Sequence, residues 1–104
     1  MPQQEIAGKV VDLDDEGFMT DPHDWNEDIA RALATEIDID LNDRHFMVIN
    51  FMRSQFEAHG KVPSLRRVKN DSGVGTKELY QLFPKGPAKK AARIAGLGKP
   101  EGCI

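Results

Sequence analysis

The residue with the clearest capacity for chemistry is Cys103, the single cysteine of the chain. A cysteine that serves packing belongs in a helix or strand that buries it, because a free thiol behaves as a small hydrophobic group. Cys103 instead follows residues 96–102, which are rich in glycine and contain a proline. When stretched, such a segment reaches roughly 25 Å at about 3.5 Å per residue. This position favours a thiol that is carried into another protein.

The chemistry expected of such a thiol is sulfur exchange. An unperturbed cysteine has a pKa of about 8.5, whereas the nucleophile is the thiolate. Lys99 and the basic residues around it favour the thiolate form. Its attack on the persulfide of a partner would leave Cys103 carrying the outer sulfur. From the residues alone, a cysteine without a role is the competing interpretation.

The charge of the chain is divided between its two parts. Residues 1–60 carry four basic residues against fourteen acidic ones, a net charge of −10. Residues 61–104 carry ten basic residues against three acidic ones, a net charge of +7. Cys103 therefore belongs to the basic part, which suits an acidic partner, a nucleic acid or simply a solvated surface.

The length and composition predict one small soluble domain of 104 residues. No apolar run approaches the roughly 20 residues that a membrane helix needs. The first five residues lack the basic and apolar pattern of a signal peptide, and a lone cysteine forms no internal disulfide. We therefore expect a cytoplasmic protein with no membrane partner.

The elements that must position Cys103 are predicted to be mainly helical. Strand-forming residues and turns over about 5–19 predict a β-hairpin or a three-stranded ribbon that lies on the helices. Helical periodicity begins near Asp24, and Asp21 or Asp24 is the expected N-cap. Residues 1–95 are thus predicted to form a single helical domain, with residues 96–104 as a flexible arm.

Further short helices are predicted along the domain, which gives four or five in all. The strongest pattern starts at Asp43 and stops at Gly60, and a short helix opens at Pro63 and Ser64. The remaining two are expected from a Thr76 cap to Leu82 and from Pro87 to Ala95, where Gly96 ends the helix. The predicted fold class is a small, mainly α bundle.

The two short helices on either side of residues 71–75 resemble a helix-turn-helix. Arg66 and Arg67 lie on the first of them, and Lys77 lies on the second, which would have to face base edges. The same packing is common in small helical domains. Regulatory DNA binding through these basic residues is therefore kept as an alternative function.

No metal or cofactor site is predicted. His23, His45 and His59 are far apart, without a cysteine or histidine at ligand spacing. The glycines are dispersed and follow no strand, so the fingerprints of phosphate loops and dinucleotide sites are absent.

The C-terminal stretch LFPKGPAKKAARIAGLGKPEGCI, residues 82–104, resembles the DsrC/TusE family of sulfur-carrier proteins. Weaker agreement extends upstream through residues 79–80, 50–51, 24–25 and 15–18, so the resemblance covers nearly the whole chain. The family implies a helical bundle with an N-terminal hairpin and a mobile C-terminal arm. That fold agrees with the one predicted from the residues.

The resemblance also implies site residues. Cys103 matches the penultimate cysteine that accepts and donates persulfide sulfur, and Arg93 and Lys99 match supporting basic positions. The branch that works with sulfite reductase has a second cysteine where this chain has Ala92. A further departure is a shorter connection between Arg67 and Leu79 than typical members have. The single cysteine resembles the TusE-like branch.

The partners that this branch implies are a sulfur-donor protein complex and a tRNA 2-thiouridine synthase. The protein would then be a sulfurtransferase-type carrier rather than a stand-alone enzyme. The alternative within the family is a partner or regulator of a sulfite-reductase-type system.

Overall fold

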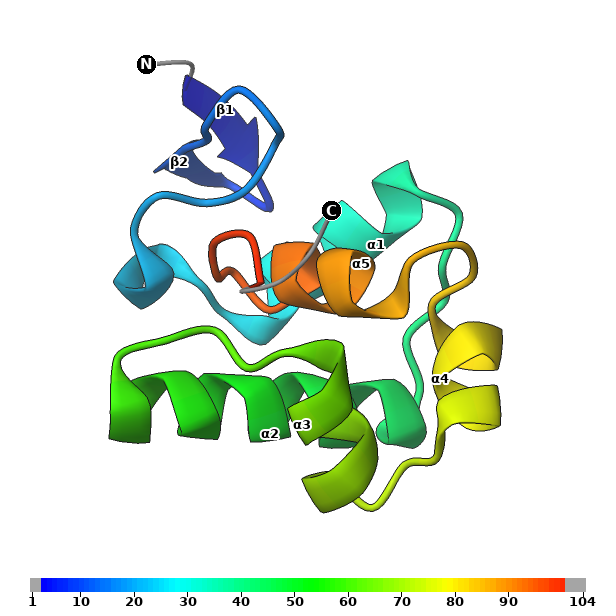
Figure 1. Cartoon of the computed structure of the whole chain (residues 1–104). Helices are drawn as coiled ribbons and strands as arrows, with labels where there is room; N and C mark the ends of the chain where they lie inside the picture. The colour runs from blue at the N-terminus through cyan, green and yellow to red at the C-terminus, as the bar shows by residue number, and fades with distance from the viewer. Residues whose placement is uncertain (1–2, 101–104) are drawn as a thin grey trace.

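The computed structural model describes residues 3–100 and begins with a tight β-hairpin (Figure 1). Strand β1 (Gln3–Ile6) pairs antiparallel with β2 (Lys9–Asp12). The turn residues Ala7 and Gly8 have φ values of 52° and 81°. Two successive positive φ angles are typical of a type I′ turn, whose twist matches that of the strands. The predicted hairpin is confirmed with two strands.

The chain beyond the hairpin makes one more strand-like contact, an isolated bridge between Leu13 and Met19. A single turn of 3-10 helix, η1 (Pro22–Asp24), follows. Five α-helices complete residues 3–100: α1 (Glu27–Glu36), α2 (Asp43–His59), α3 (Leu65–Asp71), α4 (Thr76–Leu82) and α5 (Pro87–Ile94). The predicted mainly α fold with an N-terminal hairpin is therefore confirmed.

The longest helix, α2, has defined signals at both ends. The Asn42 side chain accepts hydrogen bonds from the backbone of Arg44 and His45, and the His45 ring accepts one from the Asn42 backbone. This reciprocal arrangement is a capping box, which satisfies backbone donors that the first turn leaves free. Gly60, with φ of 72°, ends the helix as predicted.

Two predicted caps are wrong. Asp21 caps η1, and α1 begins later, with the side chain of Asn26 accepting a hydrogen bond from Ile29 N at 2.8 Å. The chain separates these turns because Trp25 is extended, with ψ of 145°. At α4, Thr76 is already the first helical residue, and Gly75 occupies the N-cap without a side-chain hydrogen bond.

Helix α5 is the centre of the core. It contacts α1, α2, α3 and α4, and Figure 1 shows it between the hairpin and the long α2 helix. Its small residues Ala91 and Ala92 are buried, which lets neighbouring helices approach closely. Helix α5, which directly precedes the C-terminal residues, is thus held in place by four other helices.

Candidate functional site at the root of the C-terminal segment

The C-terminal end of α5 is hydrogen-bonded by side chains from distant parts of the chain. The indole Nε1 of Trp25 donates to the carbonyl of Ile94 at 2.7 Å. The guanidinium of Arg53 donates to the carbonyl of Ala95 at 2.7 Å and to that of Pro22 at 3.0 Å. The last carbonyls of a helix have no partner inside the helix, so both side chains satisfy groups that need one.

Arg53 and Trp25 also contact each other. The guanidinium carbon lies 4.2 Å from the centre of the indole ring, within the range of a cation–π interaction. Burial lowers the pKa of Arg53, and the nearby Glu57 carboxylate partly opposes that effect. An arginine stays charged under ordinary conditions. A fixed positive charge therefore lies against Ala95, the residue that follows α5.

The residues just after α5 are packed tightly. Gly96 has φ of +73°, and a Cβ there would lie 2.5 Å from the Cδ1 atom of Trp25. Leu97 is fully buried, and its backbone N–H donates to the carbonyl of Ala92 at 3.0 Å. The flexible arm over 96–104 stays a prediction, and its described residues, 96–100, begin with this anchored turn.

Arg93 and Lys99 both face the loop between β2 and η1. The Arg93 guanidinium lies against Gly17, where a Cβ would come within 3.1 Å of its central carbon. Lys99 Nζ lies 3.4 Å from the Glu16 carboxylate. Asp14 shapes the loop, because its Oδ1 accepts hydrogen bonds at 2.9 Å from the backbone of Glu16 and Phe18.

A hollow of about 250 Å³ opens beside this loop. Its lining combines three cationic side chains with one carboxylate and two apolar residues: Lys89, Lys90, Arg93, Glu16, Phe18 and Ile37. The Nε atom of Arg93 is buried there without a hydrogen-bond partner among the described residues. This is a basic surface on α5.

The sequence-predicted site residues are thus partly brought together. Arg93 and Lys99 lie against the same loop, and their supporting role stays a prediction. Cys103 lies outside the described residues. Trp25 and Arg53, which hydrogen-bond the end of α5, were not predicted as site residues, and no local pattern in the sequence around Arg53 distinguishes it.

The basic residues of the helix-turn-helix-like segment are exposed. Arg66 and Lys77 are exposed on α3 and α4, and Arg67 Nε lies 3.7 Å from the Asp71 carboxylate. No cluster of three potential metal ligands occurs within residues 3–100. Over the same range, no helix is both long and apolar enough to span a membrane.

The fold of this chain recurs in known structures. The solution structure of Allochromatium vinosum DsrC matches with a TM-score of 0.85 and 35% identity, covering 98% of this chain and 97% of that one. The crystal structure of the oxidized gamma-subunit of dissimilatory sulfite reductase (DsrC) from Archaeoglobus fulgidus matches with a TM-score of 0.82 and 38% identity, covering 99% and 100%.

The sequence places the chain in the same class. A family model described as "DsrC like protein" matches residues 5–104, and the chain belongs to this DsrC-like family. It is also 36% identical to the sulfurtransferase TusE of Yersinia pseudotuberculosis, over 96% of this chain and 99% of that protein. The family resemblance drawn from the C-terminal residues is therefore confirmed.

Proposed function

We propose that this protein is a sulfur-relay carrier that accepts and donates persulfide sulfur on Cys103. The observation that carries the proposal is the near full-length similarity to a sulfurtransferase TusE in a chain whose only cysteine is Cys103. The pathway we favour is tRNA 2-thiouridine synthesis or a related sulfur-transfer route. The partners would be a sulfur-donor protein complex and a tRNA 2-thiouridine synthase, in the cytoplasm.

The transfer is a balanced exchange between two thiols. The Cys103 thiolate attacks the outer sulfur of a persulfide on the donor, a new S–S bond forms, and the donor's own S–S bond breaks. The donor leaves as a thiolate, and the persulfide with its proton is then on Cys103. A second exchange of the same kind passes the outer sulfur to the acceptor. No electrons are gained or lost overall.

The absence of a second cysteine defines how the carrier works. A neighbouring thiol could attack the Cys103 persulfide and release its sulfur by forming an internal disulfide. Ala92, where the two-cysteine branch has that thiol, is fully buried on α5. A persulfide on Cys103 therefore has no competing thiol in its own chain, and release requires the acceptor.

The anchored root gives Arg93 and Lys99 a role in the proposal. Trp25 and Arg53 hold the end of α5, so the segment leaves from a fixed point beside a basic surface. Arg93 and Lys99 would supply positive charge near a thiolate or persulfide, which favours the anionic nucleophile. Both are supporting residues, and Cys103 is the reacting one.

Sulfur loading tests the proposal directly. The chain is incubated with a cysteine desulfurase and cysteine, and intact-mass spectrometry should show a gain of about 32 Da, one sulfur, located on Cys103. The Cys103→Ser variant should show none, while Ser72→Ala, which keeps the thiol, should load normally. Loading that persists in Cys103→Ser would exclude the proposed carrier site.

A second candidate function is favoured by the similarity to the sulfite reductase gamma-subunit of Archaeoglobus fulgidus. In that case the chain would dock on a sulfite-reductase-type enzyme as its partner or regulator. Affinity capture from the source cells with the Cys103→Ser variant separates the two, because a stable complex with such an enzyme is expected only for the second candidate.

A further inference from the structure

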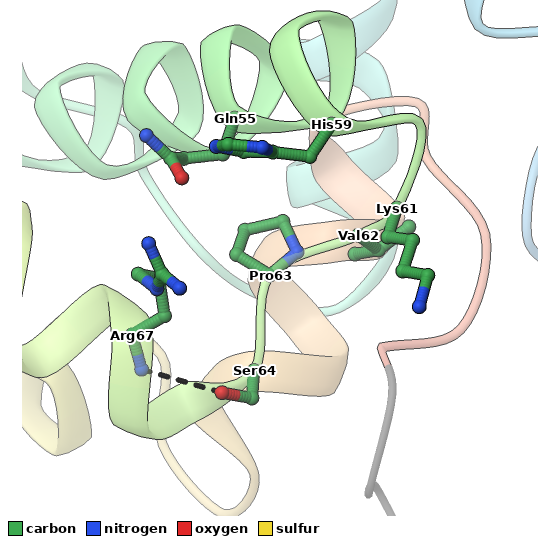
Figure 2. A pocket seen from close by; sticks show the side chains of 7 residues that line it. All are labelled: Gln55, His59, Lys61, Val62, Pro63, Ser64 and Arg67. Atoms are coloured by element: carbon green, nitrogen blue, oxygen red, sulfur yellow. Dashed lines mark hydrogen bonds between the residues drawn. The ribbon is translucent and has the colours of Figure 1, made fainter.

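A second hollow, of about 450 Å³, lies between the last turn of α2 and the start of α3 (Figure 2). Seven residues line it: Gln55, His59, Lys61, Val62, Pro63, Ser64 and Arg67. Its volume is within the range of small-molecule sites. None of the residues that surround the root of the C-terminal segment contributes to it, so it is separate from the proposed sulfur-transfer site.

The charge of this hollow is positive. Lys61 and Arg67 are among its lining residues, and none of the seven is an aspartate or glutamate. The pairing of Arg67 with Asp71 spans 3.7 Å between half-exposed side chains. Exposed pairs of this kind contribute little, so the pair does not prevent Arg67 from turning to another anion.

Rings and an amide form the other part of the hollow. Figure 2 shows His59 and Gln55 extending from α2 on one side, Arg67 of α3 and its N-cap residue Ser64 on the other, and the Pro63 ring between them. The aromatic face of His59 can stack on a nucleobase, and the Gln55 amide offers both a donor and an acceptor to a base edge. A cation beside an aromatic ring, here Arg67 with His59, is the combination that binds unpaired bases in single-stranded nucleic acids.

We propose that this hollow binds one nucleotide of a single-stranded nucleic acid. The C-terminal end of α2 carries the negative end of the helix dipole, so the phosphate is expected away from it, at Arg67 of α3. Lys61, which directly follows the end of α2 (Figure 2), adds positive charge to the surroundings but does not hold this phosphate. The base then lies on the α2 side, against His59 and Gln55. A carboxylate of a protein partner would pair with Arg67 but make no use of the His59 ring and the Gln55 amide. A nucleotide uses all three groups, so it is the ligand that we propose.

The inference goes beyond the sulfur-relay proposal and does not depend on it. The hollow contains no cysteine, and its ligand takes part in no covalent step. It also differs from the helix-turn-helix alternative, because that mode would place Lys77 of α4 in the major groove of a duplex. Sulfur loading of Cys103 and nucleotide binding can therefore succeed or fail separately.

The first experiment measures fluorescence anisotropy of labelled ten-nucleotide oligouridylate with the full chain at low salt. Arg67→Gln should raise the dissociation constant at least about fivefold, and His59→Ala should raise it by a similar factor through lost stacking. Arg66→Gln is the matched control: it removes the same charge from α3 without touching the hollow, and should change binding by less than about twofold. Equal losses in Arg66→Gln and Arg67→Gln would overturn the site.

The second experiment separates base from phosphate and polymer from free nucleotide. Uridine monophosphate should shift the NMR side-chain signals of His59 and Gln55, whereas inorganic phosphate should shift only the Arg67 region. Equal responses to both would overturn the base contact. Tighter binding of the oligonucleotide than of the monophosphate supports a polymer ligand; no difference would overturn that part of the proposal and indicate a free nucleotide.

Two competitors complete the test. A ten-base-pair DNA duplex that binds more tightly than oligouridylate, and is lost in Lys77→Gln, would overturn the proposal in favour of the helix-turn-helix mode. Poly-glutamate that displaces oligouridylate at equal charge concentration would show that only charge is recognised, which also overturns it. Unchanged sulfur loading in Arg67→Gln would show that the two sites are independent.

Discussion

The indole of Trp25 and the carbonyl of Ile94 are joined by a 2.7 Å hydrogen bond across 69 residues of sequence. This bond connects the start of the helical region to the last residue of α5. Arg53 stacks on the same indole and holds the next carbonyl, that of Ala95. The position of the turn that follows α5 is therefore determined by side chains from distant parts of the sequence.

Replacing Trp25 with phenylalanine should destabilise the fold by about 1–2 kcal/mol, because it removes the donor to Ile94 and leaves a carbonyl without its partner. The ring that stacks under Arg53 is retained. Urea denaturation followed by circular dichroism measures the change. Tyr80→Phe is the control, since Tyr80 is half exposed and should be nearly neutral. Equal midpoints for Trp25→Phe and the wild type would show that the bond contributes nothing.

Gly96→Ala should cost more than Gly98→Ala. At Gly96 the backbone is left-handed, and the new Cβ would come within 2.5 Å of Trp25, whereas nothing lies within 4 Å of a Cβ at Gly98. We expect a loss of about 1–3 kcal/mol at position 96 and less than about 0.5 kcal/mol at position 98. Thermal unfolding of the two variants provides the comparison. Similar melting temperatures would contradict the close packing on Trp25.

The helices were predictable from sequence because their signals are local. Asn42 followed by Asp43, and Gly60 at the other end, indicate the bounds of α2 through capping preferences alone. The N-cap of α1 was predicted as Asp21 or Asp24, whereas the structure has Asn26, because the position of this cap is not set by local sequence alone. It depends on Trp25, which is extended where its indole reaches Ile94.

The site was predictable in its residue types but not in its geometry. Arg93 and Lys99 were singled out from the C-terminal pattern, yet their common partner, the loop at Glu16 and Gly17, is more than 75 residues away. Arg53 belongs to a helix whose periodic pattern marks only apolar positions. The two carbonyl groups that Arg53 contacts, those of Ala95 and Pro22, come within reach of it only when α5 and η1 pack against α2.

The ion pair between Arg44 and Glu78 should make stability depend on pH. Two hydrogen bonds of 2.8 Å and 2.7 Å join the groups, and the hydrogen bond from Arg44 lowers the pKa of Glu78 from its ordinary value of 4.5. A carboxyl whose pKa is lowered by folding stabilises the protein above its unfolded pKa. That contribution is lost as the pH falls through the lower, folded pKa.

The measurement is urea denaturation of the wild type and Glu78→Gln from pH 7 to pH 3. The difference between the two should shrink as the pH falls below 4.5, the ordinary pKa of the glutamate. It should also shrink at pH 7 in high salt, because both groups are exposed to screening. Glu36→Gln serves as the control. A difference that grows toward pH 3 would contradict the direction of the pKa shift.

Lys99→Gln should slow the reaction of Cys103 with iodoacetamide at pH 7 by about twofold, a fraction of 1 kcal/mol, since an exposed charge a few residues away acts through water. The reason is electrostatic: Lys99, placed by Glu16 at 3.4 Å, favours the thiolate, the form that reacts. The pH profile of alkylation should therefore move to higher pH. Lys77→Gln removes the same charge from α4 and should leave the profile unchanged. A profile that moves equally in both variants would mean that only net charge matters, and that Lys99 has no particular role beside Cys103.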